Sequence, residues 1–185
     1  AECWDLAITD TRQPSLIVLH YTQQGSAREA LDTLRTRNSG GPVSAHYLIG
    51  KDGTIYQLVA EQERAWHAGD SQWGVTDDIN SRSIGIELDN NGNEPFAQPE
   101  IDSLLRLLTD ITTRLGIPRT SIVGHADIAP TRKDDPGAWF PWSELAAHGF
   151  GLWYDAGPLP DPPAGFDPMV ALRLVGYDLS DPTAA

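Results

Sequence analysis

The sequence is poor in cysteine, in basic residues and in long apolar runs, and each shortage limits what the protein can be. Cys3 is the only cysteine, so no internal disulfide can form, and the cysteine content leaves the redox compartment open. Because Ala1 and Glu2 precede it, we expect Cys3 to be an ordinary residue rather than a lipid-anchored first residue.

Basic residues are outnumbered by acidic ones, 13 against 26, which leaves a formal net charge of -13. A surface of that sign repels a phosphate backbone and an anionic membrane surface, so we expect no nucleic acid partner. No apolar run approaches the roughly 18 residues that a membrane span needs. The first ten residues, AECWDLAITD, lack the basic start and apolar core of a signal peptide, so any leader is expected to be gone already.

What is present suffices for one folded domain, because 185 residues that are 40% hydrophobic can bury a core. The segment 155–168 holds five prolines, which favours an extended linker or a strap over the surface. We therefore predict one domain over residues 1–154 and a Pro-rich strap with a short helix over residues 155–185. A lone helix cannot bury its own apolar face, so this helix must dock on the domain or begin a further module.

Short strands and helices alternate along the chain, which predicts an α/β fold. The long helix is the clearest element, because its apolar residues from Ile101 to Leu115 recur at helical spacing and Gly116 follows as a stop signal. Strands are predicted at residues 15–22, 44–50, 54–59, 83–89 and 120–125, and helices at residues 26–36, 98–117 and 141–149. A tight turn at residues 51–53 should join the second and third strands.

Two histidines, His20 and His125, stand at the ends of apolar strand candidates, where ligands gather in open α/β sheets. Each could also be an ordinary core histidine, and for one of them alone that interpretation is the stronger. A catalytic zinc site takes three protein ligands and leaves a fourth position for water. Two histidines and one carboxylate from the acidic loop after His125 would meet that count, although their spacing by itself is not diagnostic.

The acid Glu87 lies in the strand candidate SIGIEL. A period of two places it on the face of Ser83 and Gly85, opposite three apolar neighbours. Such a carboxylate is either solvated or works in a cleft. We expect the small residues on its face to leave room for a ligand.

Five segments, LHYT, SAHYLIGKDG, AWHAG, NSRSIGIEL and GHADIAPTRKDDPG, occur in this order. Together they resemble the signature segments of the zinc-dependent N-acetylmuramoyl-L-alanine amidases, a family that includes phage lysozyme amidases and animal peptidoglycan recognition proteins. The resemblance runs from about Ser15 to Trp153. It implies a mixed central β-sheet flanked by helices, one Zn²⁺ per chain, and hydrolysis of the amide between the lactyl group of N-acetylmuramic acid and L-alanine. By position, the zinc ligands would be His20, His125 and Asp135.

The same resemblance assigns catalytic roles. Glu87 would be the general base that takes a proton from the attacking water, and Lys133 would hydrogen-bond the oxyanion, although a lysine here could also be a surface residue. The phage and recognition-protein branch carries a tyrosine where this chain has Ala45, so the sequence is similar to the bacterial branch. Asp127 and Asp134 are expected to be loop-capping or solvated acids.

Four further residues are candidates for substrate binding. The resemblance places His67 near the zinc on the substrate side, although it could equally pack on Trp66. Arg64, Asn80 and Arg82 border segments that should line the groove, where an arginine could meet a carboxylate of the stem peptide. His46 is expected to support the site or the fold, and His148 to lie on the surface.

The expected partner is therefore peptidoglycan or a muropeptide, bound by a monomer. The expected compartment is the bacterial cell envelope, periplasmic or secreted, with cytoplasmic muropeptide recycling as the alternative. A non-catalytic peptidoglycan-binding or sensing module of the same fold is the alternative function, and residues 155–185 could begin a wall-binding module.

Overall fold

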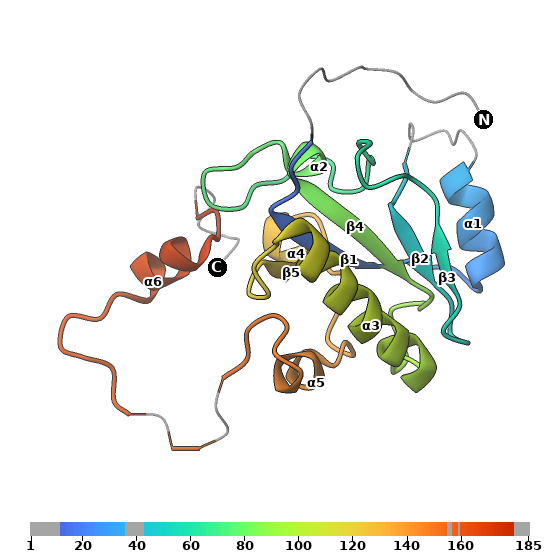
Figure 1. Ribbon diagram of the computed structural model, residues 1–185. Coiled ribbons are helices and arrows are strands. Elements are labelled where there is room, and N and C mark those ends of the chain that lie inside the picture. Colours follow the sequence, from blue (N-terminus) through green and yellow to red (C-terminus); the bar gives the residue numbers. More distant parts are fainter. Residues whose placement is uncertain (1–11, 36–42, 155–156, 159, 180–185) are drawn as a thin grey trace.

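A five-stranded mixed sheet forms the centre of the protein (Figure 1). The computed structural model describes residues 12–35, 43–154, 157–158 and 160–179, so Cys3 lies outside the described residues. The strand order is β3-β2-β4-β1-β5. The strands are β1 (Leu16–Tyr21), β2 (Tyr47–Ile49), β3 (Ile55–Gln57), β4 (Ser83–Leu88) and β5 (Ile122–Gly124). Strands β2, β4, β1 and β5 run parallel, and β3 pairs antiparallel with β2 at the edge.

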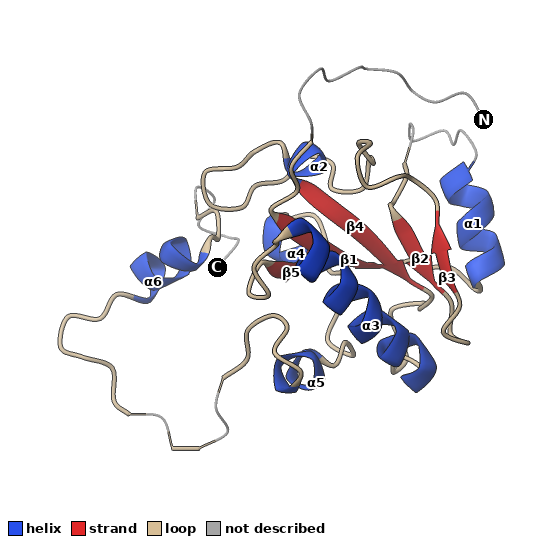
Figure 2. Ribbon diagram, in the orientation of Figure 1, coloured by secondary structure: helices blue, strands red, loops and turns tan. Residues whose placement is uncertain are grey.

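Helices lie on both faces of this sheet (Figure 2). They are α1 (Ala27–Arg35), α2 (Ile79–Arg82), α3 (Gln98–Leu115), α4 (His125–Ile128), α5 (Trp142–Ala147) and α6 (Pro168–Val175). The predicted α/β fold, with a mixed sheet flanked by helices, is thus confirmed. In the part of the chain that the structure describes, no helix is both long enough and apolar enough to cross a membrane.

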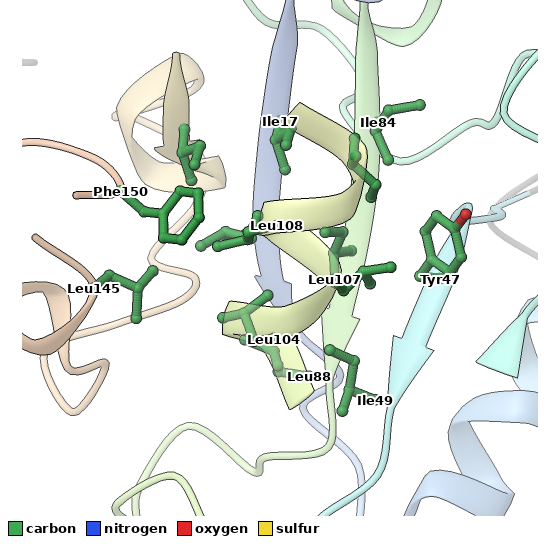
Figure 3. Packing of buried hydrophobic residues seen from close by; sticks show 14 of the residues in the cluster. Ile17, Tyr47, Ile49, Ile84, Leu88, Leu104, Leu107, Leu108, Leu145 and Phe150 are labelled. Carbon is green, nitrogen blue, oxygen red and sulfur yellow. The ribbon is translucent and has the colours of Figure 1, made fainter. Parts of the chain in front are cut away.

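The α3 helix covers one face of the sheet and forms the main core with it. Its residues Leu104 and Leu108 are fully buried against strand residues such as Ile17 and Ile84 (Figure 3). The helix ends at Leu115, and the φ of 67° at the following Gly116 is the left-handed conformation of a glycine C-cap. The helical periodicity of the sequence therefore predicted this element and its end correctly.

Because side chains alternate along β1 and β4, every second residue projects from the face of the sheet opposite α3. In β1, Leu16 and Val18 belong to a smaller cluster on that second face, together with the α2 residue Ile79 and the α4 residue Ile128. His20 follows Val18 by two residues and shares this face. The second face therefore carries His20, and α3 packs on the opposite face.

Two short helices and the strand lengths differ from the sequence-based expectation. The strand expected at 120–125 ends at Gly124, and His125 opens α4 instead. Both α2 and α4 have four residues, too few to show a helical period. Strands β2 and β3 are also shorter than predicted, with three residues each, and β3 pairs only with β2.

Residues 160–167 are exposed and lead into α6, and Figure 1 shows them looping away from the sheet. None of the described residues of α6 is buried. The chain returns directly after α6, where the Tyr177 hydroxyl donates to Asp127 Oδ1 at 2.6 Å and the Tyr177 ring packs on Trp73. The tail is thus attached to the domain by its last described residues rather than by its helix.

Candidate metal centre and active site

The site is built on two neighbouring parallel strands. His20 of β1 and Glu87 of β4 are register partners, so their side chains project from the same face of the sheet at the same level. Strand β5 pairs with the other edge of β1, and His125 follows directly after it. Two histidines predicted from separate strand ends are therefore brought together by strand pairing.

Three side chains converge on one point. His20 Nδ1 lies 2.9 Å from Asp135 Oδ2 and 3.0 Å from His125 Nδ1, and His125 Nδ1 lies 3.1 Å from the same carboxylate oxygen. These are the three residues that the sequence predicts as zinc ligands. All three are buried, with 2%, 3% and 6% of the surface of His20, His125 and Asp135 exposed.

The loop that carries Asp135 is tied back to α4. The Ala126 N–H donates to the Asp135 carbonyl at 2.8 Å, and the peptide bond between Asp135 and Pro136 is cis. Pro136 also packs on Gly124, where an added Cβ would lie 2.6 Å from Pro136 Cδ. The third side chain of the cluster is therefore held beside His125 by the backbone itself.

Electrostatics favour a cation at this point. Burial lowers the pKa of His20 to about 4, so its ring is neutral near pH 7. Burial alone would raise the pKa of Asp135, but the close contacts of its carboxylate with the rings of His125 and His20 outweigh that effect and hold the pKa below its usual range. The carboxylate is therefore ionised, and it faces the neutral imidazole of His20 and the ring of His125.

The donor set fits zinc. His125 Nε2 donates to the carbonyl of Ala68 at 3.0 Å, which leaves its Nδ1 as a bare lone pair directed at the cluster. Tetrahedral zinc with bonds near 2.0 Å separates its ligand atoms by about 3.3 Å. The three separations of 2.9, 3.0 and 3.1 Å approach this value, so only small adjustments are needed. Two neutral nitrogens and one carboxylate also leave a fourth position open.

A cavity of about 300 Å³ opens above the cluster. Glu87 lines it, and its Oε2 atom is buried with no hydrogen-bond partner among the described residues. Burial, with a smaller effect from Asp135, raises the pKa of Glu87 to about 8. A carboxylate that faces a cavity and has one buried oxygen without a partner is suited to proton transfer.

The acidic loop supplies another wall of this cavity. Lys133, Asp134 and Asp135 all line it, but Asp134 is exposed whereas Asp135 is buried. Asp127 faces elsewhere, because its Oδ2 accepts the N–H of Gly124 at 2.7 Å and its Oδ1 accepts the hydroxyl of Tyr177. The loop-capping role expected for Asp127 agrees with these contacts.

His67 lies beside the cluster, but its two nitrogens are already engaged by the protein. Its Nδ1 is 3.0 Å from His20 Nε2, and its Nε2 is 3.1 Å from Ser83 Oγ. Burial lowers its pKa well below the usual value, so the ring is neutral. The ring also fills the space above Gly85, where an added Cβ would lie 2.5 Å from His67 Cγ. The expectation that small residues on this face leave room for a ligand was therefore wrong at Gly85.

The other three substrate candidates do not line the cavity. Arg64 forms an ion pair with Asp78 at 3.0 Å, and Arg82 is exposed at the end of α2. Asn80 is buried, and its Oδ1 accepts the backbone N–H groups of His67 and Ala68, both at 2.9 Å. Within the described residues, Asn80 therefore holds the loop beside the cluster and does not reach the cavity.

The sequence analysis missed two groups that hydrogen-bond to histidines of the site, the Ala68 carbonyl at His125 and the Ser83 hydroxyl at His67. A serine at a strand start and a backbone carbonyl give no distinctive pattern, so no local signal could have found them. His46, expected to support the site or the fold, accepts the Gly85 N–H at 3.0 Å through Nδ1, and its Nε2 donates to the Glu63 carbonyl at 3.1 Å. It therefore links β4 to the loop before His67.

Comparison with known proteins agrees with the family resemblance seen in the sequence. The profile of the family described as N-acetylmuramoyl-L-alanine amidase matches residues 10–138. The N-acetylmuramoyl-L-alanine amidase AmiD of Escherichia coli strain K12 is 44% identical over 158 residues, covering 76% of this chain and 55% of that relative. The chain thus spans about half the length of this relative.

Two solved complexes share the fold. One is the E. coli AmiD complex with the substrate anhydro-N-acetylmuramic acid-L-Ala-D-gamma-Glu-L-Lys, with a TM-score of 0.76 at 38% identity, covering 95% of this chain and 76% of that chain. The other is AMPDH3 of Pseudomonas aeruginosa in complex with anhydromuramic pentapeptide, with a TM-score of 0.78 at 33% identity, covering 98% and 82%.

Proposed function

The chain belongs to the N-acetylmuramoyl-L-alanine amidase family, and from this premise we propose that it is a zinc-dependent hydrolase of peptidoglycan or muropeptides. The bond cleaved is the amide between the lactyl group of N-acetylmuramic acid and the L-alanine of the stem peptide. The observation that carries the proposal is the convergence of His20 Nδ1, His125 Nδ1 and Asp135 Oδ2 at the base of an open cavity.

His20, His125 and Asp135 would hold the metal. Zinc supplies Lewis acidity, which polarises a carbonyl and makes a water molecule acidic enough to react near neutral pH. Ala68 and His67 hold the outer nitrogens of the two histidines, so the ligands keep their orientation.

Glu87 is the general base in this proposal. It lies level with His20 on the neighbouring strand and faces the same cavity, so it can take a proton from the attacking water. Its pKa of about 8 reflects burial and the negative charge of Asp135, and a positive charge beside Asp135 opposes the second effect. A bound cation would also favour the ionised form of Glu87, which is the form that can accept a proton.

Lys133 would stabilise the oxyanion. It lines the cavity and belongs to the loop that also carries Asp135. An ammonium group there can donate to the oxygen that becomes negative when water adds to the amide carbonyl.

The test combines metal content with turnover. We expect one zinc per chain, and we expect Glu87→Gln to keep the zinc while lowering the turnover number on soluble anhydro-muropeptides by about a hundredfold or more. Glu63→Gln, which changes an exposed glutamate, is the matched control and should behave like the parent. A parent protein that binds muropeptide without releasing stem peptide would support the binding or sensing module instead.

We further infer a monomer that acts in the bacterial cell envelope, where the peptide-bearing glycan lies, and that residues 1–154 carry the activity. Gel filtration, cell fractionation and a comparison of intact sacculi with soluble muropeptides test these points. Recovery of the enzyme and its activity only from the cytoplasmic fraction would favour muropeptide recycling.

A further inference from the structure

We propose that His67 is a positioning residue for the metal site, acting through Ser83 and the carbonyl of Ile79. The three groups fix which nitrogen of His20 carries the proton and so leave the Nδ1 lone pair of His20 free for the metal. The inference rests on the metal site proposed above, and it replaces a substrate-binding role for His67.

The contacts form one continuous series. His20 Nε2 lies 3.0 Å from His67 Nδ1, and His67 Nε2 lies 3.1 Å from Ser83 Oγ. The Ser83 hydroxyl in turn donates to the Ile79 carbonyl at 2.6 Å. Ser83 is fully buried, so water does not compete for its hydroxyl.

The Ile79 carbonyl, at the end of this series, sets the direction of every hydrogen bond in it. A carbonyl oxygen only accepts, so the Ser83 proton points to Ile79 and the Ser83 oxygen must accept from His67 Nε2. A neutral imidazole has one N–H, so His67 Nδ1 is an acceptor. His20 must then donate through Nε2, and its Nδ1 is bare at the point where it meets Asp135.

The opposite direction of these hydrogen bonds would keep His20 from binding a metal. A proton on His67 Nδ1 would force His20 Nε2 to accept, and the proton of His20 would then lie on Nδ1, where it occupies the ligand position. The Ile79 carbonyl would also lose the buried hydrogen bond that the Ser83 hydroxyl donates to it, which costs free energy. The arrangement therefore selects the form of His20 that binds a metal.

The loop around His67 serves both histidines. Asn80 Oδ1 accepts the N–H groups of His67 and Ala68, and Ala68 offers its carbonyl to His125 Nε2. Gly85 provides the space in which the His67 ring lies. The adjacent residues His67 and Ala68 thus hold the Nε2 atoms of His20 and His125, respectively.

The experiment measures zinc affinity without substrate, by competition with a chromophoric chelator. His67→Phe removes both nitrogens but keeps a ring, and it should weaken zinc binding about 10- to 100-fold. His67→Asn keeps an acceptor near the place of Nδ1 and should recover most of that loss. Ser83→Ala should weaken binding less than His67→Phe, and His148→Phe, at an exposed histidine, should leave it unchanged.

A second readout does not depend on variants. Long-range proton–nitrogen correlation spectra of the zinc-loaded parent should show His67 protonated on Nε2 and bare on Nδ1. A proton on Nδ1 would overturn the proposal even if His67→Phe fails to fold. Unchanged zinc affinity in a folded His67→Phe protein, with a raised KM, would also overturn it and return His67 to the substrate. A parent that takes up no zinc would overturn the metal site itself, and this inference with it.

Discussion

Glu100 should make the stability of the protein fall as pH rises. This glutamate lies in the first turn of α3 with 0% of its surface exposed, and neither carboxylate oxygen has a hydrogen-bond partner among the described residues. Burial raises its pKa from 4.5 to about 8, although the nearby backbone N–H groups of Asp89 and Ala97 oppose this effect and the negative charge of Asp89 adds only a smaller increase. The folded protein therefore holds Glu100 protonated near neutral pH, whereas the unfolded chain ionises it.

The sign and size follow from proton linkage. Between pH 4.5 and 8 the unfolded chain binds fewer protons at this residue than the folded protein, so the free energy of unfolding decreases with pH across that window. The slope is about 1.4 kcal/mol for each pH unit, which gives about 5 kcal/mol over the whole window as an upper limit. Below pH 4.5 both states are protonated, and above 8 both are ionised, so Glu100 adds no further slope there.

Glu100→Gln removes the titration but keeps the shape of the side chain. Urea unfolding can be followed by circular dichroism at about pH 5 and about pH 8, with zinc in excess. The free energy of unfolding of the variant minus that of the parent should increase by up to about 4 kcal/mol from the lower pH to the higher one. Asp102→Asn, at an exposed acid on the same helix, is the control and should show almost no gain. An equal difference between variant and parent at both pH values would refute the assignment of a neutral Glu100.

Three further predictions concern the site and the tail. Asp135→Ala should lose zinc and activity together, whereas Asp134→Ala should keep one zinc by metal analysis; a metal-free Asp134→Ala protein would mean that the wrong acid has been chosen. Lys133→Ala should keep zinc and raise the barrier by about 2 to 4 kcal/mol, seen in the turnover number, if it serves the oxyanion. Tyr177→Phe loses the hydrogen bond to Asp127 and should lower the free energy of unfolding by about 1 to 2 kcal/mol, with turnover of soluble muropeptides unchanged.

The sequence predicted most of what depends on local pattern or on ordered motifs. The apolar run at β1, the alternation in β4 and the periodicity of α3 each gave an element of the right type and place. The family, inferred from five ordered segments, is confirmed by the profile match and by the similarity to AmiD. The three side chains predicted as ligands lie together, while their role as zinc ligands stays a prediction.

The remaining features depend on contacts between residues distant in sequence, which no single-chain pattern encodes. His20 meets His67 across 47 positions, and Tyr177 meets Asp127 across 50. Asn80 looked like a groove residue because it adjoins a motif, yet its amide is turned inward to two backbone N–H groups. The orientation of a side chain on a loop is set by such tertiary partners.

The hydrogen bond from the Ala126 N–H to the Asp135 carbonyl affects how the protein acquires and loses its metal. Because the fold already orders the loop that carries Asp135, metal binding loses no free energy to the ordering of that loop. Chelated protein should still unfold in one cooperative transition, and returned zinc should restore turnover without a refolding step. Zinc supply would then set the fraction of molecules that are active and leave the fraction that is folded nearly constant, so a cell could keep a reserve of intact, idle enzyme.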